Sequence, residues 1–181
     1  MTLIRPTREE DAALLPDIER SSGEVFRTIP DLAWIADDDV QSAEAHREFL
    51  RTRLSVVAVD ADDRPIAFLC AGITGDAMHI WQLAVTAECQ GQGLGRSLML
   101  AAIAHARVTA LAAVTLTTFR DLPWNELFYR KLGFSTLAAD ELDVRLAQIL
   151  ANEAAHGLPP ERRCAMRLAL GHAPAVRKAG H

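Results

Sequence analysis

The sequence predicts a mixed α/β (α+β) fold, in which a mostly antiparallel sheet is flanked by helices. Three strand-like runs, at residues 55–60, 65–73 and 77–85, follow one another with only short polar connections. This order is typical of an antiparallel meander. Amphipathic segments with helical spacing precede and follow the three runs, so helices are available to cover the sheet.

The start of the chain predicts a short strand and two helices. Residues 3–5 form the strand, and Thr7 and Glu10 have the spacing of a capping box at the start of a first helix. Ser42 is predicted to cap a second helix over residues 42–51. The side chains of this helix that are predicted to face inward are Ala45, Phe49 and Leu50.

The most informative feature is the glycine-rich segment at residues 90–95, which reads QGQGLG. It follows the strand at residues 77–85 and opens an amphipathic helix predicted over residues 94–108. A glycine-rich turn at the start of a helix directs several unpaired backbone N–H groups toward one point, and the helix dipole adds positive charge there. The segment therefore predicts a binding site for a phosphate or pyrophosphate.

Two familiar glycine loops do not fit this segment. The phosphate loop of nucleotide hydrolases ends in Lys followed by Ser or Thr, whereas Gly95 is followed by Arg96 and Ser97. A dinucleotide-binding fold needs the pattern GxGxxG early in a βαβ unit. Here Gly91, Gly93 and Gly95 are spaced GxGxG and lie in the middle of the chain. Both interpretations are therefore excluded.

A second motif lies downstream of the glycine loop. Residues 113–119 are rich in β-branched side chains and predict a strand, and a short helix follows that begins at Asn125 and ends at Gly133. An Asn at this helix start and a Tyr four residues before Gly-Phe resemble a signature of the Gcn5-related N-acetyltransferase (GNAT) family. The pattern Gln-x-x-Gly-x-Gly after a Leu-Ala-Val strand resembles the acyl-CoA loop of the same family. The resemblance covers about residues 2–138 and a final strand.

The resemblance implies the GNAT acyl-CoA N-acyltransferase fold and direct transfer of an acetyl group from acetyl-CoA to a primary amine. Backbone groups of Leu83, Ala84 and Val85 would pair with the pantetheine arm. Tyr129 occupies the position of the family's general acid, and a buried structural tyrosine is the alternative. Asn125 would hydrogen-bond the pantetheine or cap its own helix. The residues implied to hold the pyrophosphate are Gln90, Gly91, Gln92, Gly93, Leu94, Gly95, Arg96 and Ser97.

The usual general base is missing from the sequence. Many family members carry Glu just before the Leu-x-Val run or on the following strand, where this chain has Gln82 and Thr117. Neither side chain takes up a proton near neutral pH. His79 is the best local substitute, because residues 79–85 resemble the strand of arylalkylamine acetyltransferases and an unshifted histidine suits a base. A histidine packed only for structural reasons, Glu24 acting through water, and water alone are the alternatives.

Acidic and aromatic residues gather between the first two predicted helices, in a region that forms one wall of the acceptor cleft in the family. Glu24, Phe26 and Trp34 are the candidate substrate-binding residues, and Asp31 and residues 37–39 add negative charge. We expect a small cationic amine with an apolar or aromatic body as acceptor. A solvated acidic loop is the alternative. Acetylation of a protein N-terminus or lysine, and a non-catalytic acyl-CoA-binding sensor module, are the rival functions.

The end of the chain departs from a minimal GNAT domain. Residues 140–155 predict an extra helix between the last two strands, and Gly157 closes it. Residues 162–168 predict the closing strand, paired with a strand that begins at Gly133. A cover over the substrate, a homodimer contact and added packing are the three interpretations of the extra helix.

Composition limits the remaining possibilities. The chain has 181 residues, half of them apolar, which predicts one domain over residues 1–170 and a disordered tail over residues 171–181. A net charge of −5 argues against a nucleic-acid partner. Without a long apolar run or a signal peptide, we expect a cytoplasmic protein with no membrane partner. Cys70, Cys89 and Cys164 lack metal-ligand spacing, so neither a metal nor a disulfide framework is expected.

Overall fold

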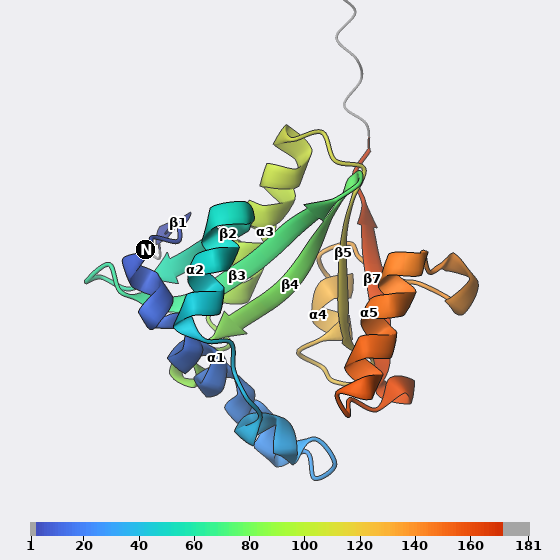
Figure 1. Cartoon of the computed structure of the whole chain (residues 1–181), viewed down its shortest axis with the longest axis horizontal. Helices are drawn as coiled ribbons and strands as arrows, with labels where there is room; N and C mark the ends of the chain where they lie inside the picture. The colour runs from blue at the N-terminus through green and yellow to red at the C-terminus, as the bar shows by residue number, and fades with distance from the viewer. Residues whose placement is uncertain (1–2, 172–181) are drawn as a thin grey trace, which may run out of the picture. The chain divides into compact units, whose positions relative to one another are not determined.

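The computed structural model describes residues 3–171, and these hold a seven-stranded sheet in the order β1-β2-β3-β4-β5-β7-β6 (Figure 1). The predicted fold class is confirmed. The strands are β1 Leu3–Pro6, β2 Leu54–Val59, β3 Pro65–Thr74, β4 Ala77–Val85, β5 Ala113–Phe119, β6 Ser135–Thr136 and β7 Arg163–Ala169. The helices are α1 Leu15–Gly23, α2 Ala43–Thr52, α3 Leu94–Val108, α4 Glu126–Arg130 and α5 Val144–Ala155. The short 3-10 helices are η1 Glu10–Ala13, η2 Glu24–Thr28, η3 Ala33–Asp37, η4 Ala87–Cys89, η5 Ala139–Glu141 and η6 Pro160–Arg162.

The chain divides into two compact units. The first unit contains the residues up to Gly72 together with Ile80–Ala102, and the second contains Ile73–His79 and the residues from Ile103 onward. The single domain expected over residues 1–170 stays a prediction. The expected disordered tail lies, from residue 172 onward, outside the described residues.

The first unit is built on antiparallel pairing of β1 with β2 and of β2 with β3. Figure 1 shows α2 in front of these strands and α3 behind them. Because alternate side chains of a strand point to the same face, the apolar residues of β2, β3 and β4 gather against α1. This core consists of Leu15, Ile18, Val57, Val59, Phe68, Cys70 and Ala84, with Phe49 packed at its edge.

The capping box predicted for the first helix is wrong. The Thr7 hydroxyl lies 2.8 Å from the Ser55 hydroxyl, and Asp11 rather than Glu10 accepts a local hydrogen bond, from the Arg8 backbone N–H at 2.7 Å. The chain first forms the single 3-10 turn η1, and α1 begins only at Leu15. A tertiary contact to β2 has therefore replaced the local cap.

The start of α2 agrees with the prediction, but its inward face is shifted by one residue. The Ser42 hydroxyl accepts a hydrogen bond from the Ala45 N–H at 3.1 Å, which confirms the cap. Ala45 is exposed, and His46 is the buried residue of this helix, with its ring edge-on to Phe68 at 5.3 Å. Phe49 lies one helical turn further on, which fits the same buried stripe.

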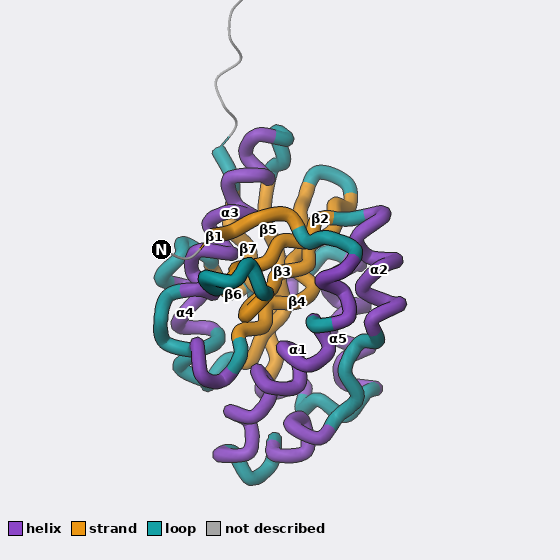
Figure 2. Tube along the Cα trace, turned by 90° about the vertical axis from the view of Figure 1, so that its left-hand side faces the viewer, coloured by secondary structure: helices purple, strands orange, loops and turns teal. Residues whose placement is uncertain are grey.

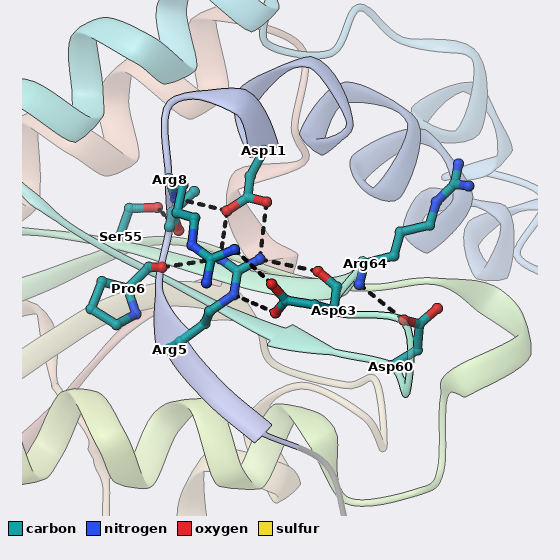
Figure 3. A network of polar contacts seen from close by, with 9 residues as sticks. Arg5, Pro6, Arg8, Asp11, Ser55, Asp60, Asp63 and Arg64 are labelled. Carbon is teal, nitrogen blue, oxygen red and sulfur yellow. Dashed lines mark hydrogen bonds and ion pairs between the residues drawn. The ribbon is translucent and has the colours of Figure 1, made fainter.

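Figure 3 shows a network of ion pairs that ties the start of the chain to the turn between β2 and β3. The Arg5 guanidinium donates to Asp11 at 2.6 and 3.1 Å and to Asp63 at 2.8 Å. Burial alone would raise the pKa of Asp11, but hydrogen bonds from Arg5 and from the Arg8 N–H lower it overall. The folded state therefore favours the ionised carboxylate.

The second unit contains a strand pairing that the sequence reading missed. β7 pairs with β6, as predicted, but it also pairs with β5 along its whole length, so β7 lies between them. Figure 2 shows α4 and α5 on opposite sides of β5 and β7. The extra helix is confirmed, although it begins at Val144 rather than at residue 140. Asp143 caps it by accepting from the Leu146 N–H at 2.7 Å.

Replacing Asp11 with Asn tests the network of Figure 3. We expect the free energy of unfolding at pH 7 to fall by about 1–3 kcal/mol, because Arg5 loses a buried anionic partner. Since the folded pKa of Asp11 is lowered, its stabilisation is present above the unfolded pKa of about 3.9 and is lost as the pH falls below it. Asp17→Asn, in the exposed Arg20–Asp17 pair, is the control and should have little effect on urea denaturation. Equal losses in both variants would contradict the network's role.

Candidate functional site

In the first unit, the glycine loop after β4 leaves an open cradle at the start of α3. Gly91 and Gly93 have φ angles of +75° and +83°, and a Cβ atom added at either position would meet no atom within 4 Å. The Ser97 N–H bonds back to the Gly93 carbonyl at 3.0 Å, which begins the hydrogen-bond ladder of α3. The N–H groups of Leu94, Gly95 and Arg96 precede that ladder, so they can bind an anion.

Side chains from within and outside the loop brace its backbone. The Gln90 amide donates to the Val85 carbonyl at 3.1 Å, and the Gln92 amide donates to the Glu88 carbonyl at 3.1 Å. The Ser21 hydroxyl, at the end of α1, accepts from the Ala87 N–H at 2.9 Å. The two glutamine side chains thus bond to the backbone, which leaves the backbone N–H groups as the groups available for an anion.

At the end of β4, the residues predicted to pair with a pantetheine arm flank the buried side chain of Ala84. Ala84 is buried in the core of the first unit, whereas Leu83 and Val85 are half-buried on the opposite face of the strand. This packing fixes the position of the three residues predicted to pair with a pantetheine arm.

The acidic residues of the predicted acceptor wall are partly neutralised within the protein. Arg27 lies between Glu24 and Asp37, at 2.8 Å from the first carboxylate and 2.7 Å from the second, and so joins η2 to η3. Phe26 is half-buried, and Trp34 is 38% exposed. Both predicted aromatic residues are thus at least partly exposed to solvent. The negative charge around Glu24 is smaller than the sequence suggests, because Arg27 is paired with it.

In the second unit, Tyr129 is placed on α4 and is only 9% exposed. Its ring meets Phe128 and Phe134 edge-on, with centroids 5.0 and 6.0 Å apart. Burial raises the pKa of Tyr129 to about 12, and the nearby Arg163 cation opposes that rise. The phenol is therefore protonated throughout the neutral pH range, as a proton donor must be.

Asn125 stands immediately before α4, where the motif predicts it. Its carbonyl accepts from the Tyr129 N–H at 3.1 Å, but its side chain makes no capping hydrogen bond. The alternative in which Asn125 caps its own helix is therefore not used in this structure.

His79 is buried, at 1% exposure, in a polar cluster of the second unit. Its Nδ1 lies 3.0 Å from the Thr115 hydroxyl, which also accepts from Arg145 Nη2 at 3.2 Å. Burial, together with the Arg145 cation, lowers the pKa of His79 to about 4. Such a group is a weak base toward an ammonium ion, so the structural alternative for His79 is favoured.

The Glu153 carboxylate lies against Thr117, which is one of the two positions where many family members carry Glu. The Thr117 hydroxyl donates to Glu153 at 2.5 Å, and Arg163 donates two hydrogen bonds of 2.9 Å to the same carboxylate. Sequence reasoning missed Glu153 and Arg163 because no local spacing connects α5 with β5 and β7.

Two further expectations concern metal sites and membranes. Between residues 3 and 171, no group of three or more His, Cys, Asp or Glu side chains is arranged to hold a metal ion. Within the same range, no helix combines the length and apolar character that crossing a membrane requires.

The lowered pKa of His79 predicts a pH dependence of folding. The unfolded chain binds a proton here near pH 6.5 and the folded chain only near pH 4, so stability falls as the pH drops through that window. Between pH 7 and pH 5 we expect the wild-type protein to lose about 2 kcal/mol more than His79→Asn in urea titrations. Equal losses in both proteins would show that His79 is not buried in its neutral form.

The chain is similar to known proteins both in sequence and in fold. Mycothiol acetyltransferase from Actinosynnema mirum is 32% identical over 136 residues, which are 75% of this chain and 44% of that protein. The chain thus spans less than half the length of this relative. Two solved structures share the fold, each with a TM-score of 0.68. The PaiA N-acetyltransferase from Thermoplasma acidophilum, in complex with coenzyme A, is 18% identical and covers 94% of this chain and 99% of its own. The ribosomal-protein-S18-alanine N-acetyltransferase from Escherichia coli is 16% identical and covers 97% and 98%.

A comparison with sequence models of protein families covers a longer segment than the glycine loop or the motif that begins at Asn125. The sequence model of the Acetyltransferase (GNAT) family matches residues 22–134, which include the glycine loop, Asn125 and Tyr129. Because this match covers more than half of the chain, the protein belongs to the GNAT acetyltransferase family.

Proposed function

We propose that this protein transfers an acetyl group from acetyl-CoA to a primary amine, with both substrates bound at once. The observation that carries the proposal is the open glycine loop at the start of α3. Its two positive φ angles and the N–H groups ahead of the α3 ladder fit a pyrophosphate. In this proposal Leu83, Ala84 and Val85 pair with the pantetheine arm, and Asn125 hydrogen-bonds it.

The proposed reaction is a direct acyl transfer. The nitrogen of the neutral amine attacks the thioester carbonyl, so that a C–N bond forms and the C–S bond breaks. Tyr129 donates its proton to the departing CoA thiolate, and the proton that the amine nitrogen loses restores the phenol through solvent. The products are the N-acetyl amide and free CoA thiol. A donor with a pKa of about 12 stays protonated between turnovers, although it gives up its proton reluctantly.

The substrate ammonium must lose a proton before the amine can attack, and no side chain is a strong candidate for the base that takes it up. His79 as the base stays a prediction, and its burial and lowered pKa weigh against it. The Glu24 carboxylate is engaged in an ion pair with Arg27 at 2.8 Å. We therefore favour release of this proton to water, with the small neutral fraction of the amine as the reactive form.

We propose a small cationic amine with an apolar body as the acceptor, with Trp34 and Phe26 providing ring surface. Because Arg27 pairs with Glu24 and Asp37, less negative charge is available to attract the cationic amine than the sequence predicts. The likeness to mycothiol acetyltransferase favours a second candidate, an amine related to mycothiol. A protein N-terminus, a lysine side chain and a non-catalytic acyl-CoA sensor are the remaining alternatives.

The first experiment is acetyl-CoA turnover, followed by release of free thiol, with a panel of amines. The panel contains polyamines, arylalkylamines, amino acids, short peptides and a mycothiol-related amine, and a blank contains no acceptor. Release above the blank with one class would identify the acceptor. Acetyl-CoA binding without release in any class would contradict the transferase and support the sensor module. Activity only with neutral or anionic acceptors would contradict the cationic-amine proposal.

Replacing Tyr129 with Phe tests the proton donor. We expect turnover to fall by roughly 10-fold to 10⁴-fold, because the thiolate must leave without a proton from the enzyme. The affinity for CoA, measured by calorimetry, should stay close to that of the wild-type protein and serves as the control for folding. Unchanged turnover would remove Tyr129 from the mechanism.

Replacing Gly93 with Ala tests the loop. A non-glycine residue at a φ of +83° is strained, so we expect the free energy of unfolding to fall by about 1 kcal/mol. The shifted N–H groups should weaken CoA binding roughly tenfold. Gly75→Ala is the matched control, since Gly75 has a φ of +61° and equally open surroundings but lies in the turn between β3 and β4. The control should lose stability alone, and equal CoA affinity in both variants would contradict the proposed role of the loop.

A further inference from the structure

We propose that Arg53 binds a carboxylate carried by the acceptor amine, whose apolar body lies against Trp81. The inference rests on the proposed function for one point, that the bound molecule is the acceptor. It narrows the acceptor class, because the molecule then has an ammonium at its reacting end and a carboxylate at the other end. All of the residues concerned belong to the first unit.

Two aromatic rings hold the Arg53 side chain in place. Its guanidinium carbon lies 5.0 Å from the centre of the Phe49 ring and 5.7 Å from the centre of the Trp81 ring. Its backbone is fixed as well, because the Arg53 N–H donates to the Phe49 carbonyl at 3.0 Å at the end of α2. A guanidinium that is already stacked loses little further freedom when a ligand binds to it.

These ring contacts leave the hydrogen-bond donors of Arg53 available. A cation–π contact uses the charge of the guanidinium but none of its five N–H donors. Within residues 3–171, the Arg53 side chain forms no hydrogen bond and no ion pair, whereas Arg51 pairs with Glu9 at 3.5 Å and with Glu48 at 3.4 Å. Arg53 is also exposed, so a carboxylate from solution can reach its donors and pair with two of them at once.

Gly72 of β3 makes room for this arrangement. A Cβ atom at this position would lie 3.0 Å from Trp81 Nε1 and 3.3 Å from Arg53 Cδ, which is closer than side chains normally approach. The indole and the arginine stem therefore pack onto the backbone of β3. Trp81 is nevertheless 43% exposed, so it offers apolar surface beside the Arg53 cation. A ligand that fits both features carries an anion on an apolar body.

Trp81 connects this pair of side chains with the proposed acyl-transfer site. It lies on β4 two residues before Leu83, the first residue proposed to pair with the pantetheine arm. A strand rises about 3.3 Å per residue, so the two Cα atoms are about 7 Å apart. An acceptor that spans this distance places its amine at the thioester while its carboxylate stays on Arg53. A surface arginine stacked only for stability is the alternative, and it would bind no carboxylate.

Carboxylate binding can be followed at Trp81 without any assay of catalysis. The chain has three tryptophans, so growth on 5-fluorotryptophan gives three fluorine NMR signals, and the signal missing from Trp81→Phe is that of Trp81. The probes are 4-methylbenzoate and the neutral 4-methylbenzamide, which have the same size and ring. We expect the benzoate to shift the Trp81 signal saturably and to bind roughly tenfold more tightly than the benzamide, because charged hydrogen bonds are the stronger ones.

Variants at Arg53 separate its charge from its shape. Arg53→Met keeps an apolar side chain against the rings but removes the donors, so it should weaken benzoate binding roughly tenfold, to the level of the benzamide. Arg53→Lys keeps the charge without the planar fork and should retain only part of the preference. Arg51→Met is the matched control, since Arg51 already pairs with two glutamates and its loss should leave benzoate affinity close to that of the wild-type protein. Equal affinity of the wild-type protein for both probes, no shift with either, or unchanged benzoate binding in Arg53→Met would overturn the inference.

Two further measurements test whether the carboxylate belongs to the acceptor. CoA affinity, measured by calorimetry, should be the same in Arg53→Met and the wild-type protein, and a tenfold loss would assign Arg53 to a CoA phosphate instead. With 4-(aminomethyl)benzoate and 4-(aminomethyl)benzamide as acceptors, Arg53→Met should lose its preference for the acid roughly tenfold, through KM rather than kcat. The same preference in both proteins, or acetylation of other amines but of neither of these, would overturn the assignment to the acceptor. If benzoate binding depends on Arg53 but no amine is acetylated, the proposed function fails while the carboxylate site stands.

Discussion

The left-handed backbone at Gly91 and Gly93 is the constraint on which the proposed cofactor site depends. Positive φ angles there turn the chain from β4 into α3, and the space beside both glycines is open, since a Cβ added at either would meet no atom within 4 Å. Side chains with a Cβ would strain these positions, and so glycine is needed for conformation rather than for close packing. Within the loop, the Gln90 and Gln92 amides donate hydrogen bonds to backbone carbonyls, and just before it the Ser21 hydroxyl accepts one from the Ala87 N–H. The loop is thus hydrogen-bonded at its edges and open beside its two glycines.

Burial has opposite consequences for the two titratable residues that the sequence singles out. In each case the protein interior disfavours the charged form. His79 consequently loses basicity and stays neutral, whereas Tyr129 loses acidity and keeps its proton. Burial therefore argues against His79 as a base, whereas it keeps Tyr129 protonated, as a proton donor must be.

Arginine sets the electrostatic character of each part of the structure. Arg5 joins the start of the chain to the β2–β3 turn, Arg27 bridges two carboxylates of the η2–η3 region, and Arg163 pairs with Glu153 between β7 and α5. The planar guanidinium can pair with two groups at once, which lysine cannot do with the same geometry. The chain has 19 basic and 24 acidic residues, yet its net charge says little about the charge that any one site presents.

The sequence by itself determined the meander, the glycine loop with its helix and the position of Tyr129, because periodicity, turn chemistry and motif spacing are local. It predicted β4, α3 and β5 with the bounds that the structure has. It did not predict that β7 lies between β5 and β6, that Thr7 bonds Ser55, or that Arg27 pairs with Glu24. Nor did it reveal Glu153 beside Thr117 and Arg163. These depend on side chains that are distant in the chain and on the desolvation of each group, and only the tertiary structure decides both.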